Sequence, residues 1–169
     1  WCYLPVLAFL TFNDEVEQYL CAAVLRPGNV PATCGARGVL RRLLVLLRRA
    51  FPQARFLVRL DGGYAAPELL DFLDAEPRLD FVVAMGANAV LTRLAASAMT
   101  QVRQMSATSG ETEHLYREAQ YAAQSWRHPR RVVIKAEVVR LAGREPRDNA
   151  RFVITTLRQT PRFVYTRVY

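Results

Sequence analysis

The sequence predicts an α/β fold, and three of its features support that class. In the first half, short β-rich runs alternate with segments of helical periodicity, in the order strand, strand, helix, strand, helix, strand. After residue 110 the pattern changes to strands. The chain has 169 residues, of which 51% are hydrophobic, so it is long and apolar enough to bury a sizeable core in one domain with an insertion.

Two apolar runs open the chain. Residues 2–12 and 17–26 are almost entirely apolar, and the polar residues 13–15 lie between them. This pattern predicts a hairpin of two strands that are buried on both faces. The segment Arg26-Pro27-Gly28-Asn29 then ends the second strand.

A helix is predicted for residues 35–50, because leucine and valine recur there at helical spacing. Its other side carries Arg37, Arg41, Arg42, Arg48 and Arg49. Such a face is typical either of contact with a phosphate backbone or of simple solvation, and the spacing does not separate the two.

The next elements are a strand at 55–60, a helix at 67–75 and a strand at 80–85. Pro67 stands in the first turn of this helix, with Glu68 near the positive end of its dipole. A second long helix is predicted for 89–105 and a loop for 106–110. The strands predicted after that loop cover residues 115–126, 131–141 and 151–157.

The net charge of +8 and the pI near 10 favour a polyanionic partner, since basic side chains that neutralise phosphates release counterions. Lys135 is the only lysine. A G+C-rich genome explains the preference for arginine but not the net charge. The three cysteines have no C-x-x-C pair and are expected as reduced core thiols, and no apolar run approaches the roughly 20 residues of a membrane span.

Asp61 is the strongest candidate for a chemical role. It follows the strand at 55–60 directly, and open α/β folds bind ligands at this carboxyl end of the sheet. Gly62 and Gly63 are expected to let the backbone turn sharply and to leave room for a metal ion or phosphate. A plain Asp-Gly turn explains the same spacing equally well.

Three segments, in this order, resemble DDE-type transposases of bacterial insertion sequences. They are Leu4-Pro5-Val6-Leu7-Ala8-Phe9 with Leu25-Arg26-Pro27-Gly28-Asn29; Arg59-Leu60-Asp61-Gly62-Gly63-Tyr64; and Ser125-Trp126 with residues 130–137 and 151–157. The second segment is similar to the family pattern R-x-D-[SG]-G-[FY] around the second catalytic aspartate. The resemblance spans almost the whole chain.

The resemblance implies a ribonuclease H-like mixed sheet with flanking helices, interrupted by a β-rich insertion. It divides the chain into part of the catalytic core at 1–86, a helix plus the β-rich insertion at 87–160, and the start of a return to the core at 161–169. Asp61 then matches the second catalytic aspartate and a metal ligand. The first aspartate is expected just before residue 1, because the predicted strands fit the family scheme from its second strand onward. The final glutamate is expected after residue 169, because 87–110 contains no acid and Glu137 and Glu145, which lie in the insertion, are expected to be surface charges.

The same resemblance implies a DNA transposase that cleaves and transfers DNA strands with Mg²⁺ or Mn²⁺. Two ions about 3.5–4 Å apart would be held by three carboxylates. The expected partners are double-stranded DNA, at the transposon ends and the target, and further copies of the protein. The expected location is the bacterial cytoplasm at the nucleoid, with no membrane association, and residues 1–169 alone are expected to be inactive.

DNA contacts are expected from residues near Asp61 and from the basic part of the insertion. The candidates are Arg59, Asn88, Trp126, Arg127, Arg130 and Arg131. Trp126 is suited to stacking on a flipped or unpaired base, but the alternative, that it packs in the small core of the insertion, is the favoured one.

Three other functions fit parts of the sequence. A different ribonuclease H-like nuclease, such as a resolvase, would share the carboxylates without needing Leu25-Arg26-Pro27-Gly28-Asn29. A non-catalytic DNA-binding module or a decayed transposase remnant would bind DNA without metal. A domain for a small anionic ligand would require a glycine-rich loop that enters a helix.

Overall fold

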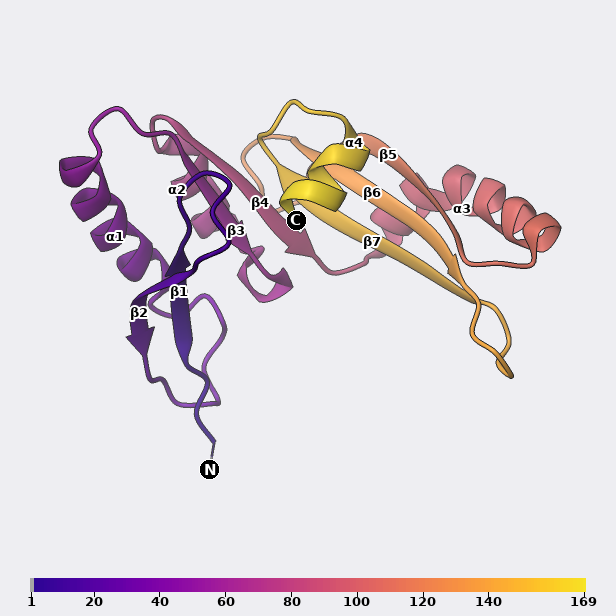
Figure 1. Cartoon of the computed structure of the whole chain (residues 1–169), viewed down its shortest axis with the longest axis horizontal. Helices are drawn as coiled ribbons and strands as arrows, with labels where there is room; N and C mark the ends of the chain where they lie inside the picture. Colours follow the sequence, from indigo (N-terminus) through magenta and orange to yellow (C-terminus); the bar gives the residue numbers. More distant parts are fainter. Residues whose placement is uncertain (1) are drawn as a thin grey trace. The chain divides into compact units, whose positions relative to one another are not determined.

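The computed structural model describes residues 2–169, which form two compact units (Figure 1). The first unit ends at Arg55 and the second is Phe56–Tyr169. None of the helices in the described part of the chain combines the length and hydropathy that a bilayer crossing requires.

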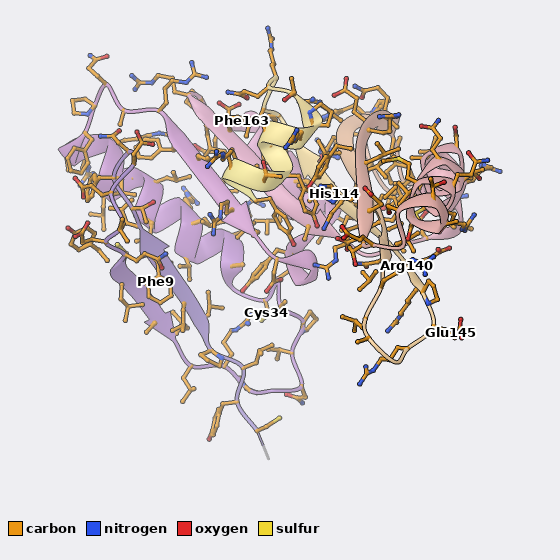
Figure 2. All side chains as sticks on the ribbon, turned by 45° about the vertical axis from the view of Figure 1, so that its right-hand side comes forward. Phe9, Cys34, His114, Arg140, Glu145 and Phe163 are labelled. Atoms are coloured by element: carbon orange, nitrogen blue, oxygen red, sulfur yellow. The ribbon has the colours of Figure 1, made fainter. Side chains whose placement is uncertain are left out.

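The first unit contains a hairpin and a helix. Strands β1 (Val6–Leu10) and β2 (Tyr19–Val24) pair antiparallel, and helix α1 is Ala36–Ala50, so these three predicted elements are confirmed. The expected burial of the hairpin on both faces is wrong: Val6 is its only buried residue, whereas Phe9, labelled in Figure 2, and Leu20 are more than half exposed. Apolar composition predicts burial only where a second layer covers the strand, and no residue of β2 is buried by the described part of the chain. The cysteines, expected in the core, are free and exposed.

The segment after β2 is organised by Arg26, the arginine of Leu25-Arg26-Pro27-Gly28-Asn29. Its guanidinium is buried and donates to the backbone carbonyls of Leu4, Ala32 and Cys34 at 3.1, 2.7 and 2.7 Å. A buried guanidinium with several carbonyl acceptors fixes the path of the surrounding loop. This part of the motif therefore has a structural task.

The second unit is built on a mixed sheet of five strands in the order β3-β4-β7-β6-β5. The strands are β3 (Phe56–Leu60), β4 (Leu79–Met85), β5 (Glu113–Tyr121), β6 (Arg130–Val139) and β7 (Arg147–Thr155). Strands β3 and β4 are parallel, and all other neighbours are antiparallel. This mixed sheet with flanking helices confirms the expected fold class and agrees with a ribonuclease H-like core.

Helices lie on both faces of this sheet. Helix α3 (Ala89–Ser109) contacts β5, β6 and β7 and buries Leu91, Ala95 and Val102 (Figure 1). On the other face, α4 (Pro161–Phe163) and the single helical turn η2 (Val164–Val168) bring Val164 onto Val82, Val133 and Val153. Helix α2 (Pro67–Ala75), predicted with the same bounds, contacts β4.

Several predicted boundaries differ from the structure; β7, for example, begins at Arg147 rather than at residue 151. Residues 106–109, predicted as a loop, extend α3, which ends only where Gly110 adopts φ 76° and donates its N–H to the carbonyl of Ser106. Strand β5 ends at Tyr121, so Trp126 lies in the following loop rather than in the strand. The strands of the predicted core and insertion share one sheet, and the division at residue 86 stays a prediction.

Gly28 should not tolerate a side chain. A Cβ there would lie 2.3 Å from the Sγ and 2.8 Å from the carbonyl oxygen of Cys2, whose carbonyl accepts the Gly28 N–H. We expect Gly28→Ala to lower the free energy of unfolding by roughly 1–3 kcal/mol, the usual cost of forced backbone shifts. Urea unfolding measures the change.

Gly38→Ala is the matched control in the same unit. Gly38 lies inside α1, where a Cβ would meet only the end of Arg42 at 4.0 Å. Since glycine costs about 0.5–1 kcal/mol inside a helix, this variant should be more stable than the wild type. Equal effects of the two substitutions would contradict the account of Gly28.

Candidate active site

Asp61 lies directly after β3, at the carboxyl end of the parallel pair β3–β4. It is exposed, and its Oδ1 accepts the N–H of Gly63 at 2.8 Å, which starts the short helical turn η1 (Gly62–Tyr64). Its second carboxylate oxygen makes no hydrogen bond among residues 2–169. The carboxylate is therefore oriented by the chain and still open to a ligand.

The expected reason for the two glycines is wrong in one respect. Neither Gly62 nor Gly63 has a positive φ, so the turn does not demand glycine conformations. A Cβ on Gly62 would be in ordinary contact with the Ala84 carbonyl, at 3.8 Å. Gly62 is thus consistent with the second expectation, that the glycines leave space, since an added Cβ would meet nothing closer than Ala84.

Asn88 follows β4 at the same edge of the sheet, because β3 and β4 run parallel. Its Oδ1 accepts the N–H groups of Val90 and Leu91, both at 3.0 Å, and so caps α3. Its amide donates to the Tyr121 hydroxyl at 3.0 Å. This side chain therefore ties the start of α3 to the end of β5.

Arg130 joins β6 to α2 in the interior of the second unit. It is 4% exposed, and its Nη2 lies 2.6 Å from an oxygen of both Asp71 and Asp74. Its Nε donates to Asp74 at 2.8 Å. Two carboxylates around one buried guanidinium make a charge-assisted cluster that fixes α2 against the sheet.

Trp126 completes this cluster. Its ring is 9% exposed, stands edge-on to Tyr121 at 5.2 Å and faces the Arg130 guanidinium at 4.9 Å. The burial agrees with the packing alternative for Trp126. Its role as a DNA contact stays a prediction, as does that of Asn88 and Arg130.

The remaining DNA-binding candidates are nearer the surface. Arg59 is exposed on β3, two residues before Asp61, and Arg127 is exposed with an ion pair to Asp71 at 3.1 Å. Arg131 binds Glu118 and the carbonyl oxygens of Leu157 and Gln159. Of these three, Arg59 is the one that lies on β3, the strand that Asp61 directly follows.

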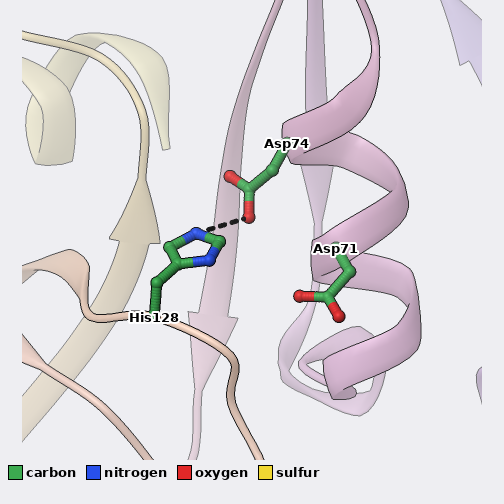
Figure 3. Close-up of side chains that lie close together, drawn as sticks. All are labelled: Asp71, Asp74 and His128. Atoms are coloured by element: carbon green, nitrogen blue, oxygen red, sulfur yellow. Dashed lines mark ion pairs between the residues drawn. The ribbon is translucent and has the colours of Figure 1, made fainter.

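Asp71, Asp74 and His128 lie close enough together to hold a metal ion, and Figure 3 shows the ion pair between His128 and Asp74. A guanidinium already bridges the two carboxylates, however, and its positive charge opposes a cation there. We therefore interpret these residues as an ion-pair cluster. Among residues 2–169 no group of three metal-binding side chains includes Asp61.

Sequence reasoning missed this cluster. Asp71 and Asp74 are three residues apart on α2 and so share a helix face, which is a readable signal. Their partner Arg130 is more than fifty residues further along the chain. Only the fold brings the three together.

Glu137 was expected to be a surface charge, and this is wrong. It is 9% exposed, binds Lys135 through Oε1 and accepts from Asn149 at 2.6 Å through Oε2. Burial raises the pKa of the Glu137 carboxyl, but the hydrogen bonds from Lys135 and Asn149 and the charges of Lys135 and Arg151 outweigh it, so the pKa lies below its usual value. Glu145 is exposed in the loop between β6 and β7, as expected (Figure 2).

Removal of the Arg130 guanidinium should destabilise the second unit strongly. Arg130→Met leaves Asp71 and Asp74 without their shared partner, and we expect a loss of about 3–5 kcal/mol in the free energy of unfolding. Arg127→Met removes an ion pair whose arginine side chain is 84% exposed and should cost less than about 1 kcal/mol. Urea unfolding compares the two, and similar losses would refute the cluster.

Glu137 should make stability depend on pH in the acidic range. Because its pKa is lower in the folded state, the carboxylate stabilises the fold above the unfolded value of about 4.3, and this contribution disappears as the pH falls through the folded pKa. Glu137→Gln should therefore be less stable by about 1–2 kcal/mol at pH 7 and approach the wild type in acid. The charged and titratable groups near the Glu137 carboxylate are Lys135, Arg151 and His114, which is paired with Glu137 on the neighbouring strand β5. A stability difference that does not change with pH would argue against this interpretation.

One comparison with known proteins identifies the chain. The family model described as transposase DDE domain group 1 matches residues 1–169. No curated protein and no solved structure matches the chain. The matched model covers the whole sequence, including Asp61 at the end of β3. The chain belongs to the transposases of the DDE domain group 1 family.

Proposed function

We propose that this chain is part of an enzyme that cleaves and transfers DNA strands during transposition of a bacterial insertion sequence. The observation that carries the proposal is the open carboxylate of Asp61 at the end of a parallel strand, in a chain that belongs to a transposase family. The net charge of +8 supports a DNA substrate, the transposon ends and the target.

Asp61 is the proposed metal ligand. A carboxylate is the ligand type that Mg²⁺ and Mn²⁺ prefer, and hydrogen bonding to Gly63 leaves one oxygen for the ion. When bound, a pair of such ions supplies the charge stabilisation that phosphodiester cleavage needs. One carboxylate is not enough to hold a pair of metal ions, so the two other acids are expected outside residues 1–169. Residues 1–169 alone should therefore be inactive.

Other parts of the proposal rest on the family. Joining two transposon ends requires more than one active site, and we expect the enzyme to act as an oligomer on bacterial DNA at the nucleoid. The proposed DNA contacts remain the six residues Arg59, Asn88, Trp126, Arg127, Arg130 and Arg131. Of these, Arg59 lies nearest to Asp61 along the chain.

Asp61→Asn tests the proposal in the transposase that contains this chain. Asparagine keeps the acceptor for Gly63 and removes the charge, so the fold should persist while Mg²⁺-dependent cleavage of transposon-end DNA falls at least about 10³-fold. Asp148→Asn is the matched control, since Asp148 is an exposed partner of Arg103 on β7 and should retain activity. Gel assays of end cleavage give both rates.

Cleavage that survives Asp61→Asn would exclude a catalytic role for this residue. DNA binding without any metal-dependent cleavage in the wild type would favour a non-catalytic module or a decayed remnant. Metal-dependent nicking by residues 1–169 alone would contradict the expected inactivity of this stretch.

A further inference from the structure

The face of the sheet that carries Asp61 can be followed across the second unit. Arg59 pairs with Val82, and Val82 packs with Val133 and Val153 under Val164. Side chains two residues apart on a strand point to the same face. Asp61, two residues after Arg59, therefore lies on the face that bears α4 and η2.

Lys135 and Arg151 lie on this same face. Lys135 is two residues after Val133, Arg151 is two residues before Val153, and the two are paired across β6 and β7. The β4–β7 ladder ends with the pair Met85 and Phe152, and Arg151 comes directly before Phe152 on β7. Neighbouring strands are about 4.8 Å apart, which puts the backbone of Arg151 two strands, or roughly 10 Å, from β3.

Aromatic rings accompany these two cations. Tyr116 pairs with Lys135, and its ring lies 5.6 Å from that of Tyr165 and 5.3 Å from that of His114. The ammonium group of Lys135 lies 5.7 Å from the centre of the Tyr165 ring. His114, labelled in Figure 2, is exposed, and Tyr116 and Tyr165 are half-buried, so both tyrosines are partly accessible to solvent.

The electrostatics of this surface favour a polyanion. The charge of Glu137, the acid in its middle, is balanced by its ion pair with Lys135, and Asn149 donates a hydrogen bond to its other oxygen, so Arg151 supplies the excess positive charge. Burial raises the pKa of Tyr165, against the opposing charge and hydrogen bond of Arg151, so the phenol stays uncharged at neutral pH and does not repel a phosphate. Among residues 2–169, the guanidinium of Arg151 hydrogen-bonds to Asn149 at 3.4 Å and to Tyr165.

We propose that this surface, the tyrosine platform (His114, Tyr116, Lys135, Arg151 and Tyr165), binds the unpaired nucleotides of a DNA end. Unpaired bases stack on aromatic side chains, and Lys135 and Arg151 contact their phosphates. Bases inside a duplex are already stacked on one another and cannot use the rings. Tyr116 on β5 lies four strands, or roughly 19 Å, from β3, which Asp61 directly follows, and a few nucleotides cover that span.

The inference rests on the proposed function and adds to it the state of the DNA. The platform holds a frayed or cut end by its unpaired bases, while the phosphodiester to be attacked lies at Asp61. Tyr116 and Tyr165 are positioning residues in this scheme, and the reaction itself stays with the carboxylate.

Binding is best measured without metal, by fluorescence anisotropy of the transposase that contains this chain, in EDTA. The probes are a labelled blunt duplex and the same duplex with a short unpaired 3′ tail. We expect the wild type to prefer the tailed probe. Tyr116→Leu, which keeps apolar packing but removes the ring, should weaken binding of the tailed probe about 5- to 100-fold and leave the blunt probe unchanged.

Three further variants control the experiment. Tyr116→Phe keeps the ring and should bind like the wild type. Tyr3→Ala removes a tyrosine that is 67% exposed in the first unit and should have no effect on tail preference. Arg151→Gln should weaken binding of the tailed probe. It should also reduce the slope of log affinity against log salt concentration by about 1.

Equal affinity of the wild type for both probes would overturn the inference, as would tail preference that survives Tyr116→Leu. The proposed function is tested separately by Mg²⁺-dependent cleavage. Cleavage that depends on Asp61 without tail preference would refute the platform alone. Tail preference without cleavage would refute the proposed function and leave the platform as a DNA-binding surface.

Discussion

The pairing of β4 with β7 is the contact on which the second unit depends. It joins the parallel pair β3–β4 to the antiparallel strands β5, β6 and β7, so that one continuous sheet results. Thr155 reinforces it, because its buried hydroxyl donates to the carbonyl of Phe81 at 2.7 Å. The register also fixes which side chains share a face with Asp61: a shift by one residue between β4 and β7 would place Lys135 and Arg151 on the opposite face of the sheet from Asp61.

Structural and chemical tasks are divided between two sets of charged residues. Arg130 is buried and forms ion pairs with Asp71 and Asp74. These ion pairs fix α2, the helix that follows the Asp61 loop, against the sheet. Arg26 does the same for the first unit through backbone carbonyls. Asp61 is exposed, with one oxygen held and one open. A rigid scaffold around an open carboxylate is the arrangement that a metal-dependent site requires.

Sequence periodicity predicted most of the elements, including α2 with its bounds, α1 and the strand before Asp61. These are the elements whose signals are local: apolar spacing, Pro67 at a helix start and an Asp-Gly-Gly break. The cluster around Arg130 and the burial of Glu137 could not be predicted in this way. Both depend on which strand lies beside which, and the sequence pattern does not determine that β7 pairs with β4. For the same reason an exposed hairpin was mistaken for a buried one.

The central claim is that Asp61, and not the cluster of Asp71, Asp74 and His128, holds the catalytic metal. Crystals of the transposase that contains this chain, grown with a cleaved DNA end and Mn²⁺, would test it by anomalous scattering. The account predicts two ions about 3.5–4 Å apart with an Asp61 oxygen as a ligand, at about 2.0–2.2 Å. Ions bound by Asp71, Asp74 and His128 instead, with Asp61 unliganded, would contradict it.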